Sequence, residues 1–78
     1  MIKNINKLQQ MIKEAGLSQQ DLADQLQVKQ PTISRWFNGE RQLPIKYFFC
    51  IVDIICLKTK KDILSVLNEF ITAEDKHV

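Results

Sequence analysis

Residues Ser18–Gly39 read SQQDLADQLQVKQPTISRWFNG and contain the signals for two short helices. A serine followed three residues later by an acid, Ser18 and Asp21, predicts a helix start, because each side chain can bond the backbone amide of the other. Pro31 predicts a second start, since a helix tolerates proline in its first turn, and Gly39 predicts the end of that helix. We therefore expect two helices joined by a three-residue turn, over Gln19–Leu26 and Gln30–Phe37.

The second of these helices has two chemically different sides. Ile33, Trp36 and Phe37 recur at helical spacing and predict the side that packs against the rest of the domain. The other positions carry no acidic residue. Their polar groups can pair with base edges, and their apolar groups can contact a thymine methyl group. This arrangement is typical of a helix-turn-helix, whose second helix lies in the major groove of DNA. The predicted base contacts are Gln30, Pro31, Thr32, Ser34 and Arg35.

Helical signals continue on both sides of this unit. Apolar residues at helical spacing predict a first helix over about Asn4–Ala15 that stops at Gly16, and Pro44 predicts a fourth helix that ends at about Cys56. The stretch Thr59–Asp62 repeats the capping pattern and predicts the start of a fifth. We expect a compact all-α, five-helix domain over residues 1–71, with the helix-turn-helix at about 18–38, helices four and five at about 44–71, and a frayed tail at 72–78.

Composition agrees with one small globular domain. Of 78 residues, 45% are hydrophobic and 26% charged, and two Gly and two Pro are too few for a turn-rich sheet protein. The longest apolar stretch, Tyr47–Leu57, is interrupted by Asp53 and is far shorter than the roughly 20 residues that span a bilayer. The first fifteen residues include three lysines and show no signal peptide. We expect a cytoplasmic protein of a bacterium or phage-infected host, with no membrane partner.

Residues that carry out catalysis or hold metals are sparse. Cys50 and Cys56 would point in different directions on one helix, and His77 is the single histidine, so neither a disulfide nor a metal site is predicted. The thiols are interpreted as small apolar side chains. The sequence also lacks a glycine-rich phosphate loop. We therefore predict no enzyme activity, no cofactor and no small-molecule ligand.

Charge is distributed unevenly along the chain. Residues 27–61 hold seven basic residues against two acidic ones, whereas residues 62–78 hold one against four. A basic middle is expected if that part meets phosphate, although an uneven solvated surface would give the same pattern. Three cations flank the second helix of the unit and are predicted phosphate contacts, namely Lys29, Arg41 and Lys46. A second group, Lys58, Lys60 and Lys61, either extends this surface or is a solvated helix start.

The chain resembles the lambda repressor/Cro family of helix-turn-helix proteins from Ile12 to about Leu57. The resemblance rests on GLSQQDLA at 16–23, Val28, QPTISRW at 30–36, NGER at 38–41 and Pro44. It implies a lambda-repressor-like fold and a transcriptional regulator that binds an operator in double-stranded DNA, usually as a homodimer. Because no sensor domain fits in the remaining residues, a Cro-like switch or small phage-type repressor is preferred.

The resemblance also implies roles for single residues. Gln19 is expected to contact a phosphate and to brace Gln30, and Asn38 is expected to contact the backbone beyond the helix. Independently of the resemblance, the amides at the start of the helix over Gln19–Leu26 can bind phosphate, and Gln20 is predicted as a further backbone contact. One position departs from the family, because Gln27 stands where glycine is common. Either the turn differs, or Gln27 accepts about 1 kcal/mol of left-handed strain.

Helix four is apolar on nearly all its sides, and helix five adds further large apolar residues. This excess predicts pairing with a second copy, although the two helices could instead complete one monomeric core. A partner of another kind is an alternative, because antitoxins and adaptors with this fold bind a toxin or other protein through the C-terminal half. The predicted dimer contacts are Phe48, Phe49, Val52, Ile55, Leu67, Phe70 and Ile71.

Overall fold

The computed structural model describes residues 5–75, with side chains described for residues 5–70, and contains five helices and no strand in that range. The helices are α1 (Ile5–Glu14), α2 (Gln19–Leu26), α3 (Gln30–Phe37), α4 (Ile45–Thr59) and α5 (Ile63–Asp75). The predicted all-α, five-helix fold is confirmed. The bounds of α2 and α3 are those expected.

Local hydrogen bonds explain where α1 ends and α2 begins. Gly16 is left-handed, with φ 76°, and the amides of Gly16 and Leu17 bond carbonyls in the last turn of α1. Ser18 then caps α2: its Oγ accepts from the Asp21 amide at 3.0 Å, and the Asp21 carboxylate accepts from the Ser18 amide at 2.8 Å. Both features were predicted from the sequence, because they depend on residues at most a few positions apart.

The turn between α2 and α3 is made by a strained glutamine. Gln27 has φ 58° and ψ 42°, the left-handed conformation that glycine adopts most easily. Its amide bonds the carbonyl of Ala23, as does the amide of Val28 at 3.1 Å. Of the two possibilities left open by the sequence, the structure therefore shows the ordinary turn with strain at Gln27.

The junction of α4 and α5 differs from the sequence prediction. Helix α4 extends to Thr59, whose hydroxyl donates to the carbonyl of Ile55 at 2.7 Å, so Thr59 does not cap α5. Lys60 follows in the left-handed conformation with φ 62°, and Asp62 is the residue whose carboxylate accepts from the Ser65 amide at 2.8 Å. The predicted Thr59 cap was wrong, because a left-handed Lys60 lengthens α4 and shifts the cap to Asp62.

Helix α5 also continues beyond its predicted end. It reaches Asp75 rather than Ile71, so residues 72–75, expected in a frayed tail, are helical. Residues 76–78 and the prediction for His77 lie outside the described part of the chain.

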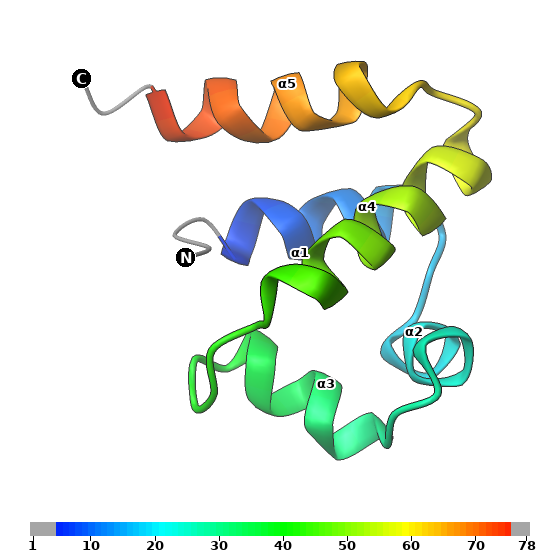
Figure 1. Cartoon of the computed structure of the whole chain (residues 1–78), viewed down its shortest axis with the longest axis vertical. Helices are drawn as coiled ribbons and strands as arrows, with labels where there is room; N and C mark the ends of the chain where they lie inside the picture. The colour runs from blue at the N-terminus through cyan, green and yellow to red at the C-terminus, as the bar shows by residue number, and fades with distance from the viewer. Residues whose placement is uncertain (1–4, 76–78) are drawn as a thin grey trace.

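All five helices contribute side chains to one core. Six large side chains are almost fully buried, and no polar or charged residue is buried among the described side chains. These six are Leu8, Leu22, Ile33, Ile51, Val52 and Val66. Figure 1 shows how the helices surround this core: α3 lies at one end of the longest axis, α5 at the other, and α4 crosses the middle on the side of the viewer. The principal extents are 35 × 28 × 20 Å.

Candidate functional site

Helix α3 is fixed to the domain along one side. Ile33, Trp36 and Phe37 are buried, as their helical spacing predicted. The Trp36 ring packs against Tyr47 of α4, with centroids 5.1 Å apart. Gln9 of α1 donates from Nε2 to the carbonyl of Phe37 at 3.2 Å. These contacts hold the C-terminal half of α3 against both α1 and α4, so the helix can present its opposite side rigidly.

The predicted base-reading residues share that opposite side. Pro31 and Arg35 are exposed, and Gln30, Thr32 and Ser34 are half-buried on the flanks. No acidic side chain lies within α3. The outward surface thus combines one guanidinium, one amide and two hydroxyls with an apolar proline edge, which are groups suited to base edges.

A hydrogen bond connects α2 to the first residue of α3. Gln30 donates from Nε2 to the Oε1 atom of Gln19 at 2.8 Å, so the predicted bracing contact is confirmed. An amide NH₂ has two hydrogens, and only one is used here. Gln30 therefore keeps one donor and its carbonyl oxygen, the pair needed for adenine N7 and N6. Gln19 keeps its NH₂ group for another acceptor, such as a phosphate oxygen.

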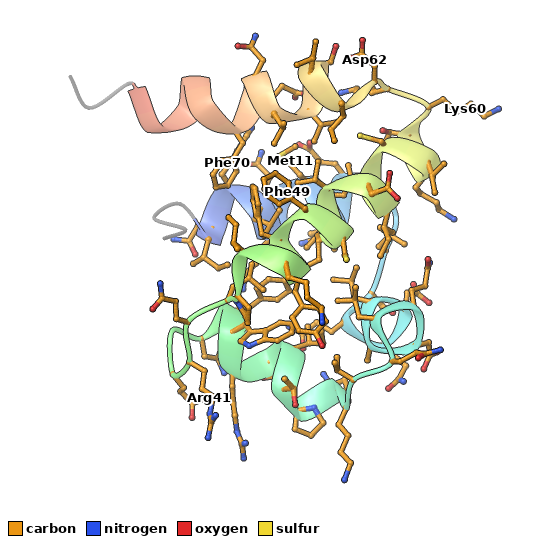
Figure 2. All side chains as sticks on the ribbon, viewed as in Figure 1. Met11, Arg41, Phe49, Lys60, Asp62 and Phe70 are labelled. Atoms are coloured by element: carbon orange, nitrogen blue, oxygen red, sulfur yellow. The ribbon has the colours of Figure 1, made fainter. Side chains whose placement is uncertain are left out.

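Cations lie around the ends of α3. Lys29 is the exposed residue immediately before the helix, and the amides of Glu40 and Arg41 both bond the carbonyl of Arg35, at 3.0 and 3.2 Å. These bonds turn the loop back, and Figure 2 shows the Arg41 side chain at the same end of the molecule as α3. The Lys46 ammonium lies 5.2 Å from the centre of the Tyr47 ring. The three cations predicted to flank α3 are thus exposed near it.

Other predicted backbone contacts make bonds inside the chain. Asn38 donates to the Ser34 hydroxyl at 3.4 Å, and Gln20 donates to the Asp24 carboxylate at 2.8 Å. At the start of α2, the Ser18 amide and hydroxyl lower the pKa of Asp21, so this carboxylate stays ionised there. The negative charge of Asp21 beside the amides at the start of α2 repels a phosphate group. This helix start is therefore a weaker phosphate site than the sequence predicted.

Two lysines of the second group, Lys60 and Lys61, lie at the start of α5, whereas Lys58 lies near Asp21 of α2. Figure 2 shows Lys60 at the junction of α4 and α5, at the opposite end of the molecule from Arg41. Lys61 pairs with Glu69 at 3.2 Å. These two lysines therefore form a solvated helix start rather than an extension of the surface around α3.

Most of the predicted dimer contacts belong to the core of a single chain. Phe48, Val52, Ile55 and Phe70 are each at most 6% exposed, and the ring of Phe48 packs on that of Phe70 with centroids 5.3 Å apart. The assignment of these four side chains to an interface is corrected, because they are already buried in the core of the single chain. Phe49 remains 50% exposed, Leu67 is half-buried, and the side chain of Ile71 lies outside the described residues.

Sequence reasoning missed two residues that position the site. Gln9 and Tyr47 hold α3 through the contacts described above. Gln9 is one of several polar residues in α1 and belongs to no motif. Tyr47 was grouped with the apolar residues of α4, so its pairing with Trp36 could not be distinguished from general core packing.

The described residues contain no cluster of three or more His, Cys, Asp or Glu side chains that could hold a metal. In the same part of the chain, no helix is long and apolar enough to span a membrane.

A family model described as Helix-turn-helix matches residues 8–49, more than half of the chain. The matched stretch begins within α1, includes all of α2 and α3, and ends within α4. It therefore contains the Gln19–Gln30 hydrogen bond and the outward side of α3. No curated protein and no solved structure matches the chain.

Proposed function

Because this chain belongs to the lambda repressor/Cro-type family of helix-turn-helix DNA-binding proteins, we propose that it represses transcription by occupying an inverted-repeat operator as a homodimer. Sequence-specific DNA binding as a transcriptional regulator is the function of this family and of this chain. The proposal goes further in naming the symmetry of the site, the mode of regulation and the residues that read it.

One observation carries the proposal: α3 presents an acid-free outward side and is held rigidly from three directions. Gln9 holds its end, Tyr47 packs on Trp36, and Gln19 braces Gln30. A reading helix needs this rigidity, because a specific base contact requires a side chain placed to within about 0.5 Å.

The proposed contacts follow from the chemistry of each side chain. Gln30 pairs with adenine N6 and N7, and Arg35 pairs with guanine O6 and N7. Pro31 and the Thr32 methyl contact thymine methyl groups, and the Ser34 hydroxyl adapts to the neighbouring base. Backbone phosphates are contacted by the residues around α3, namely Gln19, Gln20, Lys29, Asn38 and Arg41.

One reading helix covers few base pairs, so a second copy supplies the remaining specificity. A two-fold dimer places its two reading helices about 34 Å apart on one face of DNA. The proposed operator is therefore an inverted repeat with half-site centres roughly 10 base pairs apart. The proposed setting is the cytoplasm of a bacterium or of a phage-infected host.

Selection of binding sites from random duplexes tests this proposal. The expected result is an inverted repeat with the half-site spacing given above, bound more weakly as salt increases, because cations on the protein displace counterions from phosphate. Recovery of single half-sites without symmetry would contradict the homodimer. Recovery of random sequence would contradict the assignment of α3 to base reading.

A second candidate function is that of an antitoxin or adaptor that binds another protein. The observation that favours it is the exposure of large apolar side chains on both sides of the α4–α5 junction: Leu57 is 75% exposed, Leu64 73% and Ile63 45%. If this is the main function, the product of a neighbouring gene should form a stable complex with the purified chain. Replacing Leu57 and Leu64 with serine should then weaken that complex without altering DNA binding.

A further inference from the structure

The outward face of α4 has an apolar centre with opposite charges at its two ends. Lys46, Phe49, Cys50 and Asp53 are spaced at i, i+3, i+4 and i+7, so they lie on one side of the helix. All four are exposed, and Phe49 is 50% exposed. Ile45, one turn before Phe49, is 56% exposed and extends the apolar part.

This face is complementary to itself. If two copies of α4 pack antiparallel with their centre between Phe49 and Cys50, each Lys46 faces the partner's Asp53. Each Phe49 then covers the partner's Cys50. A two-fold interface requires that a surface be complementary to its own rotated copy. The order of charges on α4 meets this requirement, because it gives two equivalent Lys46–Asp53 pairs.

Two features of α4 favour its use as an interface between two copies. Lys46 lies in the first turn of the helix, where the helix dipole disfavours a positive charge, and that turn contains no acid. The Phe49 ring is held against Phe48, with centroids 5.5 Å apart, and Phe48 is buried against Phe70. Phe49 is therefore an exposed aromatic ring that is ordered before any partner arrives, which reduces the entropy lost on binding.

The position of α4 agrees with binding of both copies to one DNA duplex. In Figure 1, α3 lies at one end of the longest axis and α5 at the other, while α4 crosses the side that faces the viewer. Pairing through the outer surface of α5 would direct the two α3 helices away from each other. Pairing through the outward face of α4 leaves both α3 helices at the same end of the dimer.

We propose that the homodimer forms through this face of α4, with reciprocal Lys46–Asp53 pairs on either side of a Phe49–Cys50 centre. This inference rests on the homodimer in the proposed function and replaces the buried contacts predicted from the sequence. The face is small, since a 15-residue helix is only about 22 Å long. We therefore expect a weak dimer in free solution that becomes stable on an inverted repeat.

Charge reversal tests the pairing without disturbing the core, because both residues are exposed. Sedimentation of the free protein, at concentrations up to a few hundred micromolar, should show dimer formation weakened roughly tenfold or more in Lys46→Asp and in Asp53→Lys. The double variant, with both charges exchanged, should recover the wild-type dimer to within about threefold. Leu64→Ala, at an exposed position of α5, is the control and should leave the dimer unchanged.

Crosslinking gives a second measure of the same register. Across this interface the two Cys50 thiols lie near the two-fold axis, so a short bismaleimide should join two copies of Cys56→Ser but not two copies of Cys50→Ser. Unchanged self-association in both single charge variants, or failure of the double variant to recover, would refute the α4 interface. If inverted repeats are still bound in either case, the proposed function stands. A wild-type chain that stays monomeric both free and on DNA would refute the interface and the homodimer together.

Discussion

Gln27 provides a direct test of how the turn between α2 and α3 is held. An L-residue in the left-handed conformation costs about 1–2 kcal/mol, and the backbone of Gln27 has this conformation with φ 58°. Glycine removes that cost but loses about 0.5–1 kcal/mol more entropy on folding. The Gln27 side chain is exposed, so its removal sacrifices little packing.

The difference between these terms predicts that Gln27→Gly raises the free energy of unfolding by about 0.5–1 kcal/mol. For a domain of this size, the melting temperature should rise by roughly 2–8 °C. Thermal and urea unfolding, followed by far-ultraviolet circular dichroism, measure both quantities. Operator affinity should stay unchanged, because glycine retains the backbone conformation that sets the angle between the two helices.

Gln25→Gly is the matched control for this substitution. Gln25 is also exposed, but it lies inside α2, where glycine should lower the free energy of unfolding by about 1 kcal/mol. The same chemical change should thus have opposite signs at two positions that differ in backbone conformation. If Gln27→Gly destabilises the protein as much as Gln25→Gly, the explanation by left-handed strain is wrong.

Three further outcomes are expected. Arg35→Ala should weaken binding to the selected operator by about 1–3 kcal/mol and relax one base preference. Lys29→Ala should weaken binding to all sequences alike and reduce the salt dependence of binding. Equal losses of affinity on every duplex for both variants would argue against base reading by Arg35. Gln19→Ala should loosen Gln30 and therefore reduce discrimination at the adenine position more than it reduces binding to random DNA; a uniform loss would limit Gln19 to a phosphate contact. Bonds to Ser18 lower the pKa of Asp21 in the folded chain. The stability from this carboxylate is therefore present above its unfolded pKa and is lost as the pH falls through the lowered value. Unfolding measured between pH 7 and 2 should show that Asp21→Asn is less stable than wild type at neutral pH and that the difference disappears in acid.

The sequence predicted the features that depend on neighbouring residues. Ser18 and Asp21 bond each other three positions apart, and the left-handed Gly16 ends α1. The two sides of α3 followed from helical spacing, because a short helix with one apolar side can pack in only one orientation. The Gln19–Gln30 contact was expected through family resemblance and is confirmed by its hydrogen bond.

Local patterns were insufficient where two signals competed at the α4–α5 junction. Thr59 and Asp62 both suit a helix start. The left-handed conformation of Lys60 decided between them: α4 kept Thr59, and Asp62 capped α5. A lysine gives no sign in the sequence that it will adopt a conformation typical of glycine.

Only the tertiary structure decided which apolar residues of α4 are left for a partner. Helix α4 is apolar on most of its sides, so its spacing does not separate a side that packs within the chain from one that faces outward. Packing against Phe70 and the rest of the core buries Phe48, whereas its neighbour Phe49 stays half exposed. Helix starts and ends follow from hydrogen bonds between residues a few positions apart, and the sequence therefore determined them for α2 and α3. Burial depends on which distant helix arrives at each face, and that information exists only in the folded chain.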